Sequence, residues 1–298
     1  MASSTLSHGL QVLGDRWTVS VLLGAFLGVR RFDDWQSQLG IPRQTLTQRL
    51  KTLVTLGLLR QRPYQERPQR LGYHLTQQGL ALYDHVLMIW AWERRWGSRE
   101  MPLPQQLVHQ PCGHAFVPLM VCSHCHEHVG PNDLRFSLVV NSALMPDPAQ
   151  RQRTPRMSAQ EGPQMGLGLR VDRWALLIVS AVFLGCHYFD QLEQVLGIGP
   201  SVLARRLSGM VDDGLLLCQP DLADGRRRIY RMTPGSRDLF GYVLCFSSWA
   251  SRHHFKQASS IRPTHKGCGE AFVPKVVCSH CQALLLPHEV RGDNPNGS

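Results

Sequence analysis

The sequence lacks the features that would place the chain in a membrane or give it a catalytic centre. No uninterrupted apolar run approaches the roughly 20 residues that a membrane span needs. Residues 1–9 do not show the basic and then apolar layout of a secretory signal peptide. The chain also shows no paired carboxylates, no nucleophile beside a base and no glycine-rich phosphate loop. We therefore do not expect an enzyme.

Acidic residues are scarce relative to basic ones. The chain has 22 Asp and Glu against 32 Lys and Arg, which gives a formal net charge of +10 and a pI near 9.5. This excess favours a polyanionic partner, either nucleic acid or an anionic membrane surface. With 298 residues, of which 43% are hydrophobic, the chain is long enough for two domains with cores of their own.

The sequence contains a long internal repeat. Asp172-Arg173-Trp174 repeats Asp15-Arg16-Trp17 at an offset of 157 positions, 174 minus 17. The same offset relates Thr233 to Thr76 and continues as far as Trp92 and its counterpart. A register held over this length indicates a tandem duplication.

Residues 39–59 predict a short helix with two different faces. Leu46, Leu50 and Leu53 recur at three- and four-residue spacing, so they should form one buried stripe. Pro42 suits the first helical turn, and Gly57 suits the residue just past the end. The opposite face is polar and carries residues suited to contact with DNA, and these are Gln44, Thr47, Gln48 and Lys51.

The segment after this helix predicts a hairpin and then a long helix. Residues 58–62 and 71–75 read as two strands around a basic turn that contains Pro63 and Pro68. Thr76 is placed to cap a helix that runs to Trp96 and carries more apolar surface than one small domain covers. We expect it to pack against its counterpart near residues 240–249. Helices followed by a hairpin are typical of a winged helix-turn-helix.

The fold class we predict is mainly α with small β wings (α+β), as two tandem winged helix-turn-helix domains, each with a small zinc-ribbon-like module. Residues 145–164 hold four prolines and little apolar content, which predicts a flexible linker. The predicted divisions are 1–100 (first winged domain), 101–144 (first zinc module), 145–164 (linker), 165–257 (second winged domain), 258–290 (second zinc module) and 291–298 (disordered tail).

Six of the nine cysteines, with two histidines, form two clusters of equal spacing. The first consists of His109, Cys112, Cys122 and Cys125, and the second of His265, Cys268, Cys278 and Cys281. Each residue of the second cluster lies 156 positions after its counterpart, 265 minus 109. Three thiolates and one imidazole fill a tetrahedral zinc shell without an open position, so we expect each cluster to hold one structural zinc. This pattern indicates a reducing cytosol rather than a disulfide framework.

The duplication separates these ligands from nearby histidines. Glu270 stands where the first copy has His114, so His114 is not the fourth ligand if the two sites are equivalent. His124 and His280 recur inside the Cys-x2-Cys turns and are second choices.

By its motifs the chain resembles the HxlR-type winged-helix transcriptional regulators of prokaryotes. The motifs are Gly14-Asp15-Arg16-Trp17, Arg31-Phe32, Leu46-Thr47-Gln48-Arg49-Leu50, Gly57-Leu58 and Tyr73-His74-Leu75-Thr76. They span residues 8–96, and residues 165–255 match more loosely, with Ala204 and Arg205 in place of the threonine and glutamine. The resemblance implies a cytoplasmic, nucleoid-associated regulator that binds double-stranded DNA as a homodimer whose subunits are held together by terminal helices.

On this hypothesis the two polar helices and the two wings contact DNA. The residues expected to do so in the first unit are Arg43, Gln44, Thr47, Gln48, Arg49, Lys51, Arg67 and Arg70. Those in the second unit are Ser201, Arg205, Arg206, Ser208, Arg226, Arg227 and Arg228. Glutamine suits adenine edges, and arginine suits guanine or phosphate. Because the two helices differ, we expect an asymmetric operator.

Three alternatives stay open at this stage. The clusters could make the chain a metal- or redox-responsive sensor or a protein-interaction module that regulates DNA binding. The two units could pair within one chain as a pseudo-dimer, which we favour, or between two chains as a homodimer. A small-molecule effector could bind between the helices. Cys186, Cys218 and Cys245 are expected to be ordinary apolar cysteines.

Overall fold

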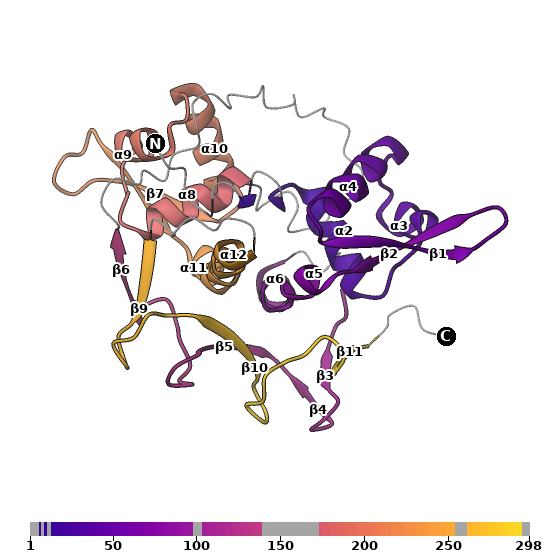
Figure 1. The fold of residues 1–298 in the computed structure, drawn as a ribbon. Coiled ribbons are helices and arrows are strands. Elements are labelled where there is room, and N and C mark those ends of the chain that lie inside the picture. The colour runs from indigo at the N-terminus through magenta and orange to yellow at the C-terminus, as the bar shows by residue number, and fades with distance from the viewer. Residues whose placement is uncertain are drawn as a thin grey trace.

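The computed structural model describes residues 6, 9–10, 13–97, 103–138, 173–253 and 261–293. The expected linker at 145–164 lies outside the described residues. Two helical units stand on either side of a central helix pair, and a layer of short strands lies along one side of both (Figure 1). None of the helices in the described part of the chain is long and apolar enough to cross a membrane.

The first unit begins with three helices. They are α2 (Arg16–Phe26), α3 (Phe32–Leu39) and α4 (Arg43–Thr55). The Asp15 carboxylate caps α2 by accepting hydrogen bonds from the Trp17 and Thr18 amides at 3.1 and 3.2 Å. The predicted stripe of Leu46, Leu50 and Leu53 is fully buried, which confirms the two-faced helix.

Pro42 and Gly57 determine where α4 begins and ends. Pro42 is the N-cap, so α4 begins one residue later than predicted. Gly57 adopts φ +69° just past the C-cap, a conformation that favours glycine. The helix therefore ends where the sequence predicts it.

The first wing is longer than predicted. β1 (Leu59–Gln65) pairs antiparallel with β2 (Arg70–Leu75), and Pro63 lies within β1 opposite Leu71. The interpretation of Pro63 as part of the turn was therefore wrong. A strand of a two-stranded ribbon has one unpaired edge, so a residue without an amide hydrogen is tolerated there.

The single long helix predicted from Thr76 to Trp96 is in fact two helices. α5 (Gln77–Leu80) is capped by Thr76, whose hydroxyl accepts from the Gly79 amide at 3.1 Å. α6 (Tyr83–Trp96) follows. A Cβ at Gly79 would lie only 2.2 Å from the Leu58 carbonyl oxygen, so α5 is docked against the start of the wing. This close contact sets α5 apart from α6.

The second unit repeats this order, which agrees with the predicted duplication. Its elements are α8 (Arg173–Phe183), α9 (Phe189–Leu196), α10 (Pro200–Asp212), β7 (Leu216–Pro220), β8 (Arg228–Met232), α11 (Pro234–Arg237) and α12 (Phe240–His253). Leu203, Leu207 and Met210 of α10 are buried, as the stripe of α4 is.

Helices α6 and α12 pack against each other with matching contacts in both directions. The Trp92 indole N–H donates to the Gly235 carbonyl at 2.7 Å, and the Trp249 indole N–H donates to the Gln78 carbonyl at 3.2 Å. Both donors and both acceptors are related by the repeat offset of 157, 249 minus 92 and 235 minus 78. Reciprocal contacts of this kind are the signature of a two-fold interface. The expected packing of the terminal helices is confirmed.

The strands after each helical unit pair with those of the other unit. They are β3 (Leu107–His109), β4 (His114–Phe116), β5 (Pro118–Cys122), β6 (Leu134–Leu138), β9 (Ile261–His265), β10 (Pro274–Cys278) and β11 (Val290–Gly292). β5 pairs with β10, β6 with β9, and β3 with β11. The segments at 101–144 and 258–290 are therefore interlocked, and not two separate modules as expected.

The predicted disordered tail is partly ordered. Residues 291 and 292 belong to β11, and the Asp293 carboxylate accepts from the Gln106 amide at 2.8 Å. An antiparallel strand partner from the first repeat holds this segment, which the sequence of the tail alone does not reveal. Residues 294–298 lie outside the described residues.

The α6–α12 interface contains two adjacent buried groups with opposite pH dependence. Burial raises the pKa of Asp84 to about 6 and lowers the pKa of His85 to about 4. Between pH 4 and 6 the folded state therefore retains a proton on Asp84 that the unfolded state has lost, so the Asp84 contribution to stability falls as pH rises. His85 behaves in the opposite way, because the unfolded state protonates it first.

Substituting Asp84→Asn should therefore expose the contribution of His85. We expect the free energy of unfolding of this variant to rise with pH between 4 and 6.5 by about 1–2 kcal/mol more than that of the native chain. Urea midpoints measured across this range test the expectation. Parallel curves for the two proteins would contradict it.

Candidate nucleic-acid interface and metal centres

Helix α4 presents a row of exposed polar side chains away from its leucine stripe. The row consists of Arg43, Gln44, Thr47, Gln48 and Lys51. The Thr47 hydroxyl donates to the Arg43 carbonyl at 2.9 Å, so its lone pairs face outward as acceptors. The Arg43 guanidinium lies 5.2 Å from the centre of the Phe32 ring, a cation–π contact that orients it at the start of the helix.

Arg49 is placed differently from this row. Its Nε lies 3.3 Å from a carboxylate oxygen of Asp15, and its side chain is 33% exposed. This ion pair holds α4 against the cap of α2. Arg49 was predicted among the DNA contacts, and the structure gives it this second, internal partner.

The equivalent face of α10 carries different side chains. Ser201, Arg205 and Ser208 are exposed, and Arg206 is half-buried at the place that Arg49 occupies in α4. A single exposed guanidinium among short hydroxyl side chains thus replaces the two glutamines of α4. The two helices share a buried stripe but offer different hydrogen-bonding groups.

Both wings are basic, but their arginines are not equivalent. In the first wing Arg67 and Arg70 are exposed near the turn. In the second wing the Arg227 guanidinium donates to both carboxylate oxygens of Asp190, at 2.9 and 3.1 Å, and lies 4.1 Å from the centre of the Tyr188 ring. Arg227 is therefore turned back onto α9, while Arg226 and Arg228 are exposed in the same loop and strand.

The two polar helices lie on the same side of the molecule. α4 and α10 stand away from the strand layer, one on each side of the α6–α12 pair, and the wings extend toward opposite ends (Figure 1). One face of a single chain thus displays two polar helices and two basic wings.

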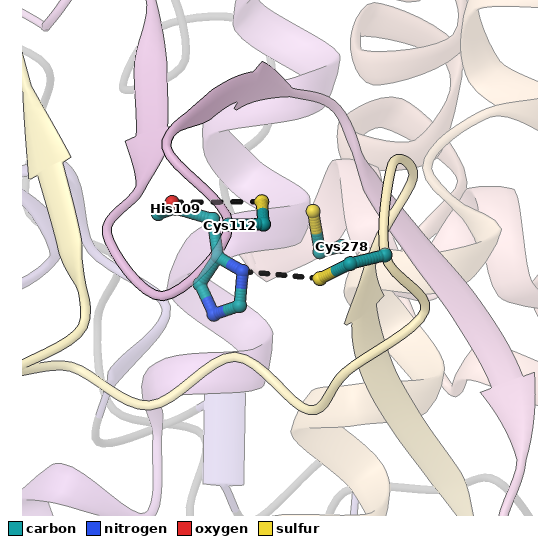
Figure 2. Close-up of side chains that lie close together, drawn as sticks. His109, Cys112 and Cys278 are labelled. Atoms are coloured by element: carbon teal, nitrogen blue, oxygen red, sulfur yellow. Dashed lines mark hydrogen bonds between the residues drawn. The ribbon is translucent and has the colours of Figure 1, made fainter.

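The eight predicted metal ligands form two groups, but each group takes ligands from both repeats. His109 and Cys112 meet Cys278 and Cys281, and the donor atoms of all four lie within 4.8 Å of one another (Figure 2). The second group is Cys122, Cys125, His265 and Cys268, within the same limit. The structure brings all eight residues into two groups of four, but the predicted grouping of one cluster per repeat was wrong. The pairing of β5 with β10 brings the halves together.

A tight turn brings the histidine and the first cysteine of each His-x2-Cys segment close together. Gly113 and Gly269, which directly follow the cysteine of each His-x2-Cys segment, adopt φ +72° and +76°. Their amides donate to the carbonyls of His109 and His265, both at 2.8 Å. Only glycine takes this conformation without strain, so each turn folds its histidine and cysteine toward the same side.

The donor distances fit a tetrahedral ion. The His109 Nδ1 lies 3.3 Å from the Cys281 sulfur, and the His265 Nδ1 lies 3.2 Å from the Cys125 sulfur. Zinc–sulfur and zinc–nitrogen bonds of about 2.3 and 2.1 Å imply nitrogen–sulfur separations near ~3.5 Å. The other ring nitrogen of His109 is buried and lies 3.7 Å from the Glu289 carboxylate, which is too far for a hydrogen bond.

The surroundings of the thiols shift their pKa values in both directions, because those of Cys125 and Cys278 are raised and those of Cys122 and Cys281 are lowered. A hydrogen bond from the Ala283 amide lowers the pKa of Cys281 to about 7. For Cys122, burial raises the pKa, but hydrogen bonds from the amides of Cys125 and His124 lower it further, so the net shift is downward. Thiolates are the form that binds zinc.

His114 and His280 lie beside the first group but outside its set of four. Their rings stack with centres 3.6 Å apart, and the His114 Nδ1 lies 2.6 Å from the Cys112 carbonyl oxygen. Together with Cys112 they form a third group of metal-binding atoms, which shares its only sulfur with the first. Both imidazoles are exposed.

The spacing of these residues along the sequence could not predict that each group draws on both repeats. Every ligand has a counterpart at the same offset, so pairing within a repeat and pairing between repeats satisfy the spacing equally. The apolar strand before Cys122 and the one before Cys278, which pair with each other, were the available signal.

Comparison with known proteins identifies the family to which the two helical units are similar. The family model for HxlR-like helix-turn-helix matches residues 12–101 and 170–258, together more than half of the chain. An HTH-type transcriptional regulator of Mycobacterium tuberculosis, itself uncharacterized, is 39% identical over 142 residues, covering 43% of this chain and 87% of the relative. Another uncharacterized one, from Synechocystis sp., is 36% identical over 75 residues, covering 25% and 56%.

A solved structure of a candidate transcription factor from Pseudomonas aeruginosa aligns with a TM-score of 0.31 and 30% identity, covering 42% of this chain and 84% of that one. The family match recurs at the interval of the internal repeat, so each half of the chain carries the family's domain. The chain belongs to the HxlR-like helix-turn-helix family of transcriptional regulators and is a tandem duplication of its domain.

Proposed function

We propose that this chain is a sequence-specific regulator in which one polypeptide binds double-stranded DNA as a pseudo-dimer. The observation that carries the proposal is the common face on which α4 and α10 lie, on either side of the reciprocal α6–α12 contact (Figure 1). Recognition helices of two-fold dimers enter successive major grooves about 34 Å apart along DNA. We propose the bacterial cytoplasm as its location.

The two helices would read different half-sites. Gln44 and Gln48 of α4 each offer a donor and an acceptor, the pair that matches an adenine edge. Arg205 of α10 offers two parallel donors, which match guanine. The arginines of the wings, Arg67, Arg70, Arg226 and Arg228, would bind phosphates or a narrow minor groove. An operator of two unlike half-sites follows.

We further propose that each composite group holds one structural zinc. Three sulfurs and one imidazole match the preference of zinc and leave no position for water or substrate. Because His109 and Cys112 would share their ion with Cys278 and Cys281, each ion would fix one repeat to the other. A regulatory role is the alternative, and chelation that reduces DNA affinity while the fold persists would favour it.

The same contacts bear on the oligomeric state. The α6 and α12 faces that would join two chains of a dimer are already covered by each other, with Trp92 and Trp249 nearly fully buried. We therefore propose a monomeric chain in solution. Sedimentation at micromolar concentration tests this, and a tight dimer would contradict it.

Substitutions in the two helices should act on different half-sites. We expect Gln48→Ala to weaken binding to the selected operator by about 10- to 100-fold, since a matched base contact contributes about 1–3 kcal/mol. The loss should depend on the bases of one half-site only. Arg205→Ala should produce a similar loss that depends on the other half-site.

The operator is first obtained by selection from a random DNA pool, and affinities are then measured by fluorescence anisotropy over a range of salt concentrations. Gln105→Ala and Arg135→Ala serve as matched controls, because both side chains are exposed in the strand layer. Binding that ignores salt, or that is unchanged by both helix substitutions, would contradict the proposed function.

A further inference from the structure

A cavity of about 440 Å³ lies between the second helical unit and the strand layer. Helices α8 and α12 form one side, and residues of β6, β9 and β10 form the other. Its volume falls within the range of about 300–1,000 Å³ that small-molecule sites occupy. It lies beside α12, the helix that packs against α6 of the other repeat.

The body of the cavity is apolar and aromatic. Phe136, Phe183 and Phe240 line it and contact one another, with ring centres 5.4 Å apart for the first pair and 5.3 Å for the second. Val179 and Val243 complete this wall. Such a lining excludes a fully polar ligand and accepts an aliphatic chain or an aromatic ring.

The first repeat fills the equivalent position with a side chain. Ser247 lines the cavity on α12, and its counterpart on α6 at the offset of 157 is Trp90, 247 minus 90. Trp90 is 7% exposed, and its indole N–H donates to the Pro104 carbonyl at 2.8 Å. A serine on one side thus leaves room where a buried tryptophan closes the other side.

The lining of the cavity includes three basic residues. They are the exposed Arg237, Arg252 and Arg262, from α11, α12 and β9. The Arg252 Nε donates to the carbonyl of Ser248, another lining residue, at 3.2 Å. Exposed arginines in the lining of an apolar pocket suit a carboxylate, because guanidinium and carboxylate form paired charge-assisted hydrogen bonds.

From these features we infer that the cavity is a binding site for a small amphipathic carboxylate. The apolar body of the ligand lies among the three phenylalanines, and its carboxylate reaches Arg252 and Arg262. Among the described residues, Trp90 fills the equivalent position of the first repeat, so we expect one such site per chain. No function in DNA binding is needed for this inference.

Binding of dodecanoate to the full chain, loaded with zinc and free of DNA, tests the site by isothermal titration calorimetry. We expect saturable binding of one dodecanoate per chain, and at least tenfold weaker binding of dodecyltrimethylammonium, which has the same tail and the opposite charge. Ser247→Trp, which installs the side chain of the first repeat, should reduce dodecanoate affinity at least tenfold.

The double variant Arg252→Gln/Arg262→Gln changes only exposed side chains, so it decides the matter even if Ser247→Trp does not fold. We expect it to weaken dodecanoate binding about tenfold and to leave the ammonium ligand unaffected. Arg135→Gln, on the strand residue next to Phe136, is the charge-matched control and should bind normally. Absence of saturable binding, equal affinity for both ligands, or unchanged affinity in the arginine variant would overturn the inference.

Discussion

Removal of zinc is expected to lower the melting temperature of the chain by about 20 °C or more. Structural zinc contributes of the order of 10 kcal/mol to small domains, and about 1 kcal/mol shifts the melting temperature of a chain this size by 2–4 °C. The strand layer has strands of only three to five residues, and they come from both repeats. It should therefore lose its structure first when the ions leave.

This prediction is measured by calorimetry before and after treatment with a strong chelator, with metal content followed in parallel. Zinc added back should restore the melting temperature, and magnesium should not, because three sulfur ligands disfavour it. An unchanged melting temperature in a chain shown to be free of metal would contradict the structural role.

Trp92→Ala should destabilise the chain by about 3–5 kcal/mol, the usual cost of removing a large buried aromatic side chain. Trp92 is 3% exposed in the α6–α12 interface, and its indole N–H donates to the Gly235 carbonyl. Trp92→Phe keeps most of the apolar contact and loses the hydrogen bond, so it should cost only about 1 kcal/mol. Urea unfolding followed by circular dichroism measures both.

The reciprocal contact makes a second expectation specific to this fold. Trp249→Ala should cost a similar amount, because Trp249 is 1% exposed and bonds to the Gln78 carbonyl in the same way. Each variant should still unfold in one transition, since both repeats depend on the shared interface. Separate transitions, with one repeat left at its native stability, would contradict the account.

Local features of the fold follow from the sequence because they depend on neighbours along the chain. The spacing of Leu46, Leu50 and Leu53 sets the buried face of α4, and Gly57 ends the helix by its positive φ. Because α10 corresponds to α4 in the repeat, the same features are predicted for α10. The choice of the eight candidate sulfur and imidazole ligands follows from the same repeat.

Long-range features could not be obtained in this way. Which half of each cluster meets which depends on β5 pairing with β10, a contact between residues more than 150 positions apart. The ion pairs of Arg227 with Asp190 and of Arg49 with Asp15 each join side chains from different parts of the fold. Charge alone made all these arginines equal candidates for DNA, and only their partners distinguish them.

The account depends on the claim that the two repeats interlock through metal sites that each draw on both. Two double variants separate this arrangement from one site per repeat, because they remove the same number of thiolates in different combinations. Cys112→Ser/Cys278→Ser takes both from one composite group, and Cys112→Ser/Cys125→Ser takes one from each.

The deciding measurement is the zinc that each double variant retains after competition with a chelator that spares both sites of the native chain. The account predicts one tightly held zinc in Cys112→Ser/Cys278→Ser and none in Cys112→Ser/Cys125→Ser. The reverse result, one zinc in Cys112→Ser/Cys125→Ser and none in Cys112→Ser/Cys278→Ser, would contradict it.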